Sequence, residues 1–307
     1  MSTVSVVVPV YYNEHSLAPL FSELLKQEEA LRQRGHALEL IFVDDGSQDS
    51  SLQELLQIKR QREATRIIKL TRNFGATHAS KTGFQLVTGD CFLVLAADLQ
   101  DPPELILEMV TKWEAGSKFV ICARANRKDP VSSKLFSYIY YRLLRWFVVD
   151  DYPKGGFDMA LMDRAFLPHV LNSSKNINPP LFQYWLGFKP EIIHYTRRER
   201  QYGKSRWTFI KKVKFFLDSI LGFSIVPIRM ISLIGVVVSL FSFGYGFVVF
   251  VNTLLGRSEV RGFATIVALI AFLLGLVIVM LGIIGEYLWR IFDETNKRPE
   301  SVIDEIY

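Results

Sequence analysis

Residues 92–104 read Phe92-Leu-Val-Leu-Ala-Ala-Asp98-Leu-Gln100-Asp-Pro-Pro-Glu104, an apolar run that stops abruptly at an aspartate. A short apolar run that ends at turn-forming residues is typical of a buried strand in an α/β sheet. The two prolines fix φ and suit the first turn of a helix, which is expected over residues 104–114. Asp98 and Gln100 would then lie beyond the carboxyl end of the strand, where open α/β sheets bind their ligands.

Asp98 and Gln100 carry oxygen atoms, which are the ligands that hard cations such as Mg²⁺ or Mn²⁺ prefer. Such cations commonly bind together with phosphate groups. Taken alone, however, the stretch is explained more simply as an aspartate that caps the next helix and a solvated turn. The choice between a metal site and a helix cap therefore depends on the residues at the ends of the neighbouring strands.

Strand and helix patterns alternate through the first 125 residues, separated by short loops. Strands are expected at residues 4–10, 38–43, 65–70 and 119–123, and helices at residues 16–34, 50–62 and 76–86. This alternation predicts an α/β fold with a doubly wound, mainly parallel sheet.

Polar residues follow two more of these strands. Residues 9–14 follow the first strand, and the pair Asp44 and Asp45 ends the second. In such a sheet these strand ends converge on one edge. The sequence has no glycine-rich phosphate loop, which argues against a dinucleotide oxidoreductase and against a P-loop NTPase. The pattern instead fits a nucleotide-diphosphate donor whose phosphates are held by a metal ion and basic side chains.

The last third of the 307-residue chain has a different composition. No charged residue occurs between Met230 and Gly256 or between Gly262 and Gly285, and each run exceeds the roughly 20 residues that a membrane-spanning helix needs. The alternative is a pair of buried core helices, which seldom lack charge over such a length. The sequence therefore predicts two transmembrane helices.

The basic residues near these two runs predict the orientation of the protein in the membrane. Lys211, Lys212, Lys214 and Arg229 precede the first run, and Arg290, Lys297 and Arg298 follow the second. This excess over the two arginines of the loop at residues 257–262 places both ends in the cytoplasm. No signal peptide precedes the first strand. The expected location is thus the inner membrane, with two spans and a cytoplasmic catalytic domain.

Four motifs together carry a resemblance to a known family. They are Val7-Val-Pro-Val-Tyr-Tyr-Asn-Glu14, Val43-Asp-Asp-Gly-Ser47, Arg72-Asn-Phe-Gly75 and Ala97-Asp-Leu-Gln-Asp-Pro-Pro-Glu104. In this order they resemble the inverting family 2 glycosyltransferases, which have a GT-A fold. The two C-terminal apolar runs narrow the resemblance to polyprenyl-phosphate glycosyltransferases, the bacterial relatives of dolichyl-phosphate mannose synthase.

The resemblance covers nearly the whole chain and implies its domain organisation. We expect a cytoplasmic GT-A catalytic domain over residues 1–206, with an interfacial helix at 134–149, and a juxtamembrane amphipathic helix at 207–227. Two transmembrane helices follow within residues 228–290, and residues 291–307 form a cytoplasmic tail. For both amphipathic segments the alternative is a helix that packs under the sheet.

The resemblance also implies which residues bind the donor. The nucleotide-binding residues carried over from the family are Pro9, Tyr11, Glu14, Asp44, Asp45 and Asp98. Asp98 and Gln100 are the expected ligands of Mg²⁺ or Mn²⁺. The family usually has Asp-x-Asp at this point, and this chain has Ala96 in place of the first aspartate. Donor phosphates and water would therefore have to supply more of the metal ligands.

Asp158 resembles the aspartate of the family's acceptor-side motif, the usual candidate for the catalytic base. A phosphate monoester is already anionic near neutral pH, so its attack requires little proton abstraction. Asp158 is therefore either a base or a residue that orients the acceptor or the sugar. A carboxylate that caps the turn after Gly155 and Gly156 is the structural alternative.

Five basic residues and one serine are expected to hold the phosphate groups of both substrates. The candidates are Arg124, Arg127, Lys134, Ser137, Arg200 and Lys204. Arg200 and Lys204 lie in a stretch that resembles the family's mobile loop over the donor diphosphate, and a solvated basic loop is the alternative. Gln201 and Trp207 are further apart than in the Gln-x-x-Arg-Trp motif of processive members, which favours a single transfer over polymerisation.

The sequence thus predicts a metal-dependent enzyme that transfers a sugar from a nucleotide sugar, such as UDP-glucose, to undecaprenyl phosphate with inversion. Its partners would be the nucleotide sugar, the lipid phosphate and the membrane, without nucleic acid, and the resemblance suggests a homo-oligomer. One alternative is a glycosyltransferase that acts on another lipid or a glycan. The other is a non-catalytic membrane scaffold of the same fold, at which Ala96 hints.

Overall fold

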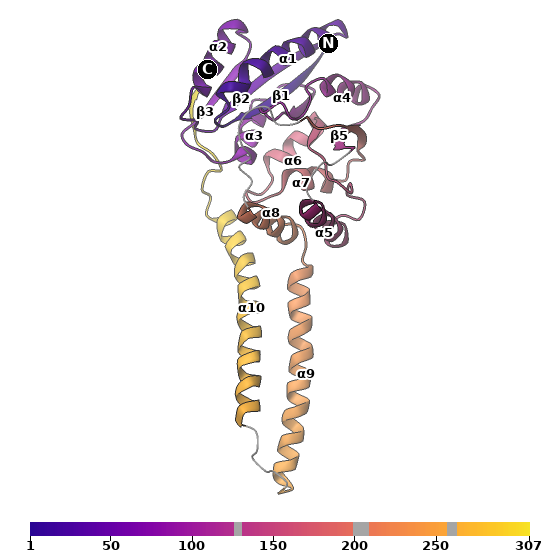
Figure 1. Cartoon of the computed structure of the whole chain (residues 1–307), viewed down its shortest axis with the longest axis vertical. Helices are drawn as coiled ribbons and strands as arrows, with labels where there is room; N and C mark the ends of the chain where they lie inside the picture. Colours follow the sequence, from indigo (N-terminus) through magenta and orange to yellow (C-terminus); the bar gives the residue numbers. More distant parts are fainter. Residues whose placement is uncertain (126–130, 199–208, 257–262) are drawn as a thin grey trace. The chain divides into compact units, whose positions relative to one another are not determined.

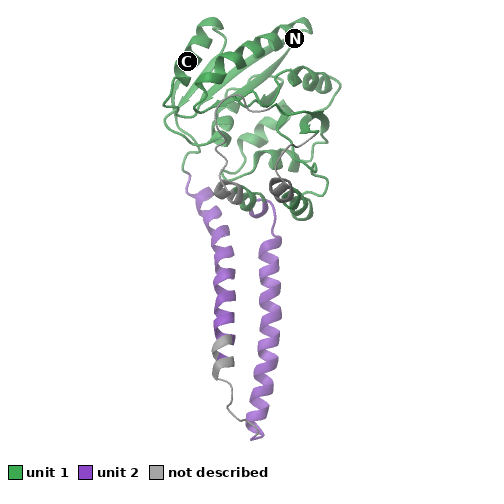
Figure 2. Ribbon diagram, in the orientation of Figure 1, with its two compact units in different colours: residues 1–219, 298–307 green, residues 220–297 purple. Residues whose placement is uncertain are grey.

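The computed structural model describes residues 1–125, 131–198, 209–256 and 263–307, and the chain divides into two compact units (Figure 1, Figure 2). The first unit comprises residues 1–219 together with residues 298–307, and the second comprises residues 220–297. The segment expected as a separate tail, residues 291–307, is therefore shared between the two units.

Within the described residues, the first unit contains one eight-stranded sheet with the order β7-β5-β6-β4-β1-β2-β3-β8. Its strands are β1 (Ser2–Val10), β2 (His36–Asp44), β3 (Arg66–Leu70), β4 (Cys91–Val94), β5 (Phe119–Arg124), β6 (Met159–Asp163), β7 (Glu191–Tyr195) and β8 (Ile303–Ile306). The strands β6 and β8 are antiparallel to their neighbours, and the other strands are parallel to one another. The predicted mainly parallel α/β sheet is confirmed.

Helices cover both faces of the sheet, because its central strands are apolar on both sides. The helices of the first unit are α1 (Glu14–Gln33), α2 (Ser51–Gln61), α3 (Ala76–Phe84), α4 (Leu105–Glu114), α5 (Val131–Phe147), α6 (Leu167–Leu171), α7 (Pro179–Trp185) and α8 (Phe209–Leu221), with a 3₁₀ turn η1 (Arg164–Phe166). Alternate residues of β1, among them Val4 and Val6, join a fully buried core with Leu17 and Leu20 of α1. Helix α3 packs on β1 and β2.

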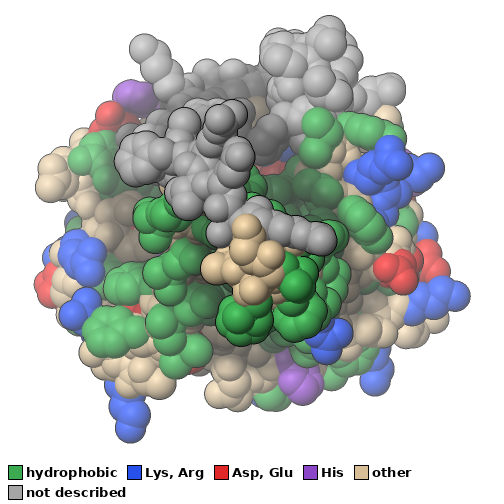
Figure 3. Space-filling view, turned by 90° about the horizontal axis from the view of Figure 1, so that it is seen from below, with side chains coloured by type: hydrophobic (Ala, Val, Ile, Leu, Met, Phe, Trp, Pro, Cys, Tyr) green, Lys and Arg blue, Asp and Glu red, His purple; other side chains and the backbone are tan. Residues whose placement is uncertain are grey.

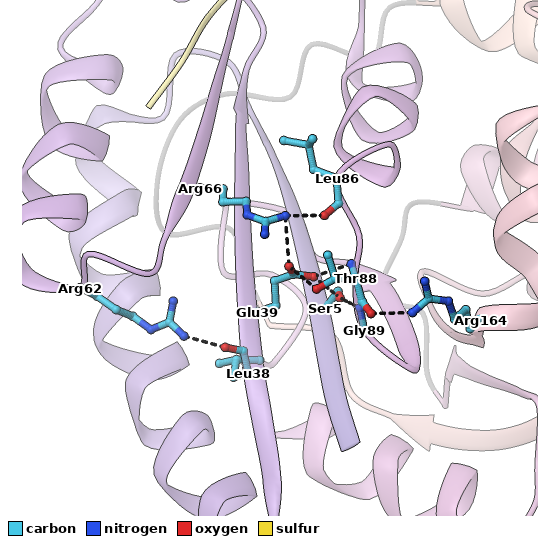
Figure 4. Close-up of polar contacts among 9 residues, drawn as sticks. All are labelled: Ser5, Leu38, Glu39, Arg62, Arg66, Leu86, Thr88, Gly89 and Arg164. Atoms are coloured by element: carbon cyan, nitrogen blue, oxygen red, sulfur yellow. Dashed lines mark hydrogen bonds and ion pairs between the residues drawn. The ribbon is translucent and has the colours of Figure 1, made fainter. Parts of the chain in front are cut away.

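A polar network closes the end of the sheet where the parallel strands begin (Figure 4). The Ser5 hydroxyl of β1 donates to the Glu39 carboxylate of β2, which also accepts from the backbone N–H and the hydroxyl of Thr88. Arg66 lies 3.3 Å from the same carboxylate. These partners satisfy one another, so this end of the sheet is tied together and its polar atoms serve the fold.

Helices α5 and α8 are joined by a buried polar network inside the first unit. The Tyr140 and Ser219 hydroxyls lie 2.9 Å apart, and the Asn178 amide donates to both of them. Helix α5 therefore has one packed face, while Tyr138 and Trp146 on the same helix are exposed. One face of this helix is thus packed in the first unit, and its predicted interfacial role stays a prediction.

The second unit consists of α9 (Val226–Leu254) and α10 (Phe263–Thr295). Val226–Leu254 and Leu269–Thr295 are each long and apolar enough to cross a membrane. Large apolar side chains along both helices, such as Phe241 and Phe272, are exposed, and hydrophobic side chains fill the middle of the view in Figure 3. The 29 residues of α9 span about 44 Å, more than the roughly 30 Å of a hydrocarbon core.

Candidate active site

Three predicted carboxylates lie at the carboxyl edge of the parallel strands. Asp45 directly follows β2, and its N–H donates to the Val10 carbonyl at the end of β1. Asp98 follows β4. Asp158 precedes β6, and because β6 is antiparallel, Asp158 lies beside the end of β5, where its N–H donates to the Cys122 carbonyl at 3.1 Å. The topology thus brings together the side chains that the sequence places more than 50 residues apart.

The loop after β1 is bonded to the loop after β2. Tyr12 has a φ of +56°, and its N–H donates to the Ser47 hydroxyl at 3.1 Å. The Glu14 carboxylate accepts from the Ser50 N–H at the start of α2. The rings of Tyr11 and Tyr12 meet edge to face, with centroids 4.6 Å apart. The predicted nucleotide-binding residues of this segment therefore lie on two loops that are joined by hydrogen bonds.

Asp45 holds the Arg72–Gly75 motif in place. One oxygen of its buried carboxylate accepts from the Phe74 N–H at 2.7 Å, and the other accepts from the Gly75 N–H at 2.9 Å and the Asn73 amide at 3.0 Å. Burial raises the pKa of Asp45, and the two backbone N–H groups partly offset this shift. The Asp-Asp pair and the Asn-Phe-Gly turn are thus two halves of one structural element.

Gly46 allows the loop after β2 to approach this turn closely. Its φ of +69° is in the left-handed region, and an added Cβ would lie 2.6 Å from the Arg72 carbonyl carbon. The neighbouring Asp44 is also buried; its carboxylate accepts from the Ser47 N–H at 3.2 Å, and burial raises its pKa.

The segment after β4 forms a tight turn. Leu99 has a φ of +57°, and the Gln100 N–H donates to the Asp98 carboxylate at 3.2 Å. The strand ends at Val94, three residues earlier than the apolar run suggests, because residues 96–101 form this turn instead. Asp101, which the sequence did not single out, is only 3% exposed and accepts a hydrogen bond from the Tyr195 hydroxyl at 2.6 Å.

The donor set of this turn is compatible with a Mg²⁺ or Mn²⁺ ion that keeps several non-protein ligands. Asp98 and Gln100 provide a carboxylate and an amide oxygen. Within the described residues, no three His, Cys, Asp or Glu side chains gather into a complete metal cage. A cation held here by Asp98 and Gln100 would take its remaining ligands from phosphate and water, as Mg²⁺ commonly does.

Asp158 is bound by a two-pronged ion pair with Arg124. Arg124 Nε and a terminal guanidinium nitrogen each lie 2.6 Å from an Asp158 oxygen, and the Tyr195 hydroxyl donates to the same carboxylate at 2.8 Å. Burial alone would raise the pKa of Asp158, but the hydrogen bonds and charge of Arg124, helped by Arg197, hold it below its ordinary value. Asp158 is therefore a stable anion whose oxygens are already engaged.

Tyr195 and Arg197 complete the site and were missed by the sequence analysis. The Tyr195 hydroxyl bridges Asp101 and Asp158, and Arg197 Nε lies 3.2 Å from Asp101. Both residues lie at the carboxyl end of β7. The rule that located Asp45 and Asp98 would have found them, but no strand was predicted over residues 191–195.

A cavity of ≈ 420 Å³ opens on the α3 face of the sheet at this edge. Pro9, Asp101, Asp158 and Arg197 line it, together with largely apolar side chains of the sheet and of α3, α6 and α7. Two further residues in its lining, Lys81 and Glu300, were not predicted.

The remaining predicted residues cannot be placed against this cavity. Arg127, Arg200 and Lys204 lie outside the described residues, as do the side chains of Lys134 and Ser137 in α5. The predicted phosphate-binding role of these five residues stays a prediction. Arg124 is described, and its guanidinium binds Asp158 rather than standing open toward the cavity.

The chain matches known proteins over most of its length. Residues 5–167 match the family described as Glycosyl transferase family 2. The chain is 35% identical to the glycosyltransferase YkcC of Bacillus subtilis over 99% of its own length and 94% of the relative's. It is 30% identical to a prophage bactoprenol glucosyl transferase homolog of Escherichia coli, over 99% of both chains. Its identity to the bactoprenol glucosyl transferase of Shigella phage SfX is 30%, over 98% of both chains.

A solved structure agrees with this assignment at the level of the fold. The glucosyl-3-phosphoglycerate synthase of Mycobacterium tuberculosis, in complex with phosphoglyceric acid, is 14% identical and superposes with a TM-score of 0.50 over 71% of this chain and 80% of that one. The predicted GT-A fold is confirmed. With the family match over more than half of its length and relatives aligned from end to end, the chain belongs to glycosyl transferase family 2 and is a glycosyltransferase.

Proposed function

We propose that this glycosyltransferase moves a sugar from a UDP-sugar, such as UDP-glucose, to undecaprenyl phosphate or a similar polyprenyl phosphate, with inversion at the anomeric carbon. The observation that carries the proposal is the end-to-end similarity to bactoprenol glucosyl transferases. The two apolar helices of the second unit support a lipid acceptor, because they would keep the enzyme at the membrane where such a lipid resides.

The reaction requires one substitution at the sugar. An oxygen of the lipid phosphate attacks the anomeric carbon, the bond from that carbon to the diphosphate oxygen breaks, and UDP leaves with the bonding electrons. A phosphate monoester is largely anionic at neutral pH, so the attacking oxygen needs no strong base. The lowered pKa of Asp158 supports a role as an orienting residue, because such a carboxylate is a weak proton acceptor.

The described residues would position the substrates rather than exchange protons with them. The paired loops after β1 and β2 would bind the nucleotide, and Arg197, at the cavity wall, would face the negative charge of the phosphates. A divalent cation bound to Asp98 and Gln100 would stabilise the charge on the departing diphosphate.

The arrangement of the chain supports a cytoplasmic catalytic unit in the inner membrane. Residues 219 and 298, on either side of the helical pair, both belong to the first unit. Two membrane crossings return a chain to the side that it left, so the sheet, its bound tail and the nucleotide-sugar site would share the side on which nucleotide sugars are made.

The proposal is tested with the full-length protein in detergent. Labelled UDP-sugars and undecaprenyl phosphate should give a product that partitions into organic solvent and has the mass of a glycosyl polyprenyl phosphate. Chelation by EDTA should abolish the product and added Mg²⁺ or Mn²⁺ should restore it. Asp98→Asn should abolish turnover, because it removes the carboxylate ligand of the cation. The proposal would be contradicted if diacylglycerol served as the acceptor instead. It would also be contradicted if none of the sugar donors gave any product.

A further inference from the structure

The C-terminal segment brings a carboxylate into the candidate active-site cavity. Glu300 follows the end of α10 by five residues and lines the same cavity as Asp101 and Asp158. Two contacts fix its position: β8 pairs with β3 directly after it, and the Ser301 hydroxyl lies 2.5 Å from the Thr82 hydroxyl of α3. Glu300 is therefore held in the wall of the cavity by structure on its carboxyl side.

Glu300 forms an ion pair with Lys81 of α3. Lys81 Nζ lies 2.7 Å from Glu300 Oε1 and 2.5 Å from the Ser173 carbonyl oxygen. Among the described residues, these two acceptors account for two of the three hydrogens of the ammonium group. The other carboxylate oxygen, Oε2, lies 3.5 Å from His78 Nδ1, which is longer than an ordinary N–H···O hydrogen bond.

The pair thus presents a donor and an acceptor side by side. Burial would raise the pKa of Glu300, but His78 and Lys81 together hold it below its ordinary value, so the carboxylate is charged at neutral pH. A hydroxyl group can donate to the carboxylate oxygen and accept from the ammonium at the same time. A phosphate offers acceptors only, and its charge would be repelled by Glu300. The chemistry of the pair therefore selects a neutral hydroxyl over an anion.

The lining of the rest of the cavity indicates what kind of ligand group this polar pair would bind. Phe84, Val94 and Met162 are among the residues that line it, and its wall is mostly apolar. Burying a hydroxyl among apolar side chains costs free energy unless the hydroxyl is hydrogen-bonded. A donor and an acceptor fixed in the wall therefore favour binding of a ligand whose hydroxyl reaches them. In the proposed donor, neutral hydroxyls are found on the ribose and on the transferred sugar, and comparison of UDP with UDP-sugars in the experiment below separates the two.

We propose that Lys81 and Glu300 bind a hydroxyl of the transferred sugar and so determine which sugar nucleotide the enzyme accepts. The proposal rests on the function proposed above, and it makes the C-terminal tail part of the active site. The simpler role, in which the pair only fastens the tail to α3, predicts a different result in the experiment below.

The test is calorimetric titration of the full-length protein in detergent with UDP, UDP-glucose, UDP-galactose, UDP-N-acetylglucosamine and UDP-xylose, followed by deoxy analogues of the sugar that binds best. Glu300→Gln and Lys81→Met should each weaken binding of that sugar nucleotide by about 10- to 100-fold, as expected for a lost charge-assisted hydrogen bond. Binding of UDP, and of the deoxy analogue that lacks the bound hydroxyl, should change less than about threefold.

Asp304→Asn is the matched control. It removes an ion pair of the same tail, between Asp304 and Lys69 at 2.5 Å, that lies outside the cavity lining, and it should leave all affinities unchanged. Equal weakening of UDP and UDP-sugar binding by Glu300→Gln would show that Glu300 acts only through the fold, and no weakening would show that it has no role; either result overturns the inference. A wild-type protein that binds UDP but none of the sugar nucleotides would overturn the proposed function as well.

Discussion

Two carboxylates of the candidate site are held in place by neighbouring groups of the protein. Asp158 is held by Arg124 and Tyr195, and Asp45 is held by the backbone of the turn at residues 73–75. At both positions the carboxylate oxygens already have partners in the absence of substrate. Side chains that are already held in place need little reorganisation when substrates bind and react.

The ion pair of Asp158 should give a defined pH dependence of stability. A carboxyl group whose pKa is lowered by folding stabilises the protein above its unfolded pKa, and this contribution is lost as the pH falls through the lower, folded pKa. The stability difference between wild type and Asp158→Asn, taken from thermal unfolding in detergent, should be about 3 kcal/mol and constant from pH 8 to pH 5. It should shrink below the ordinary value of 3.8. A difference that declines around pH 7 would contradict the assignment.

The carboxylate of Asp45 should stabilise the turn at residues 73–75. Asp45→Asn places an amide group against N–H donors that now point at a carboxylate oxygen, so we expect a loss of about 2–3 kcal/mol in the free energy of unfolding. Glu63→Gln, at an exposed position, should stay within about 0.5 kcal/mol of wild type. Equal unfolding midpoints for the two variants would show that the turn does not depend on this contact.

At the scale of elements, the largest addition to the predicted fold is β8. The tail returns to the sheet and pairs with β3: the Tyr307 N–H donates to the Ile67 carbonyl, and the Ile67 N–H donates back. Truncation after Ser301 would expose the N–H and C=O groups of β3 as an open edge. We expect a loss of about 2 kcal/mol, from several backbone hydrogen bonds, and increased aggregation by light scattering.

The matched variant for this truncation is Asp304→Asn, which removes only a partly exposed ion pair and should cost less than about 1 kcal/mol. If the truncated chain unfolds at the same temperature as wild type, β8 contributes nothing to the stability of the sheet.

The elements that the sequence predicted lie in the regular alternation of strands and helices through the first 125 residues. The strands β1, β2, β3 and β5, and the helices α1 to α4, lie within about two residues of their expected bounds. The strands β6, β7 and β8 were not predicted: all three lie beyond the regular alternation of strands and helices, and β8 pairs with a strand more than 230 residues away. Asp45, Asp98 and Asp158 were found from motifs in the sequence. Tyr195, Arg197 and Glu300 were missed, because their positions depend on β7 and β8, which were not predicted.

At the scale of the whole molecule, the division into two units separates the candidate site from the two long apolar helices. Every described residue of the candidate site belongs to the first unit, and the two long apolar helices make up the second. The chain leaves the first unit once and rejoins it once, so the helical pair is an insertion between residues 1–219 and the tail that carries Glu300.

This arrangement predicts the accessibility of two positions in intact cells. A cysteine at Ser258, between the two helices, should react with a membrane-impermeant maleimide added outside. A cysteine at Glu305, in β8, should react only after permeabilisation. The native Cys91 and Cys122 are buried, so the wild-type protein is the unlabelled control. Labelling of both positions from the same side would exclude the two-span arrangement.

The central claim, sugar transfer to a lipid phosphate, is tested most directly by acceptor-dependent release of UDP. The full-length protein, with its UDP-sugar and Mg²⁺ in detergent, should release UDP slowly by itself and at least 100-fold faster when undecaprenyl phosphate is added. One glycosyl lipid should form per UDP released. A rate that does not respond to undecaprenyl phosphate, for every UDP-sugar tried, would contradict the account.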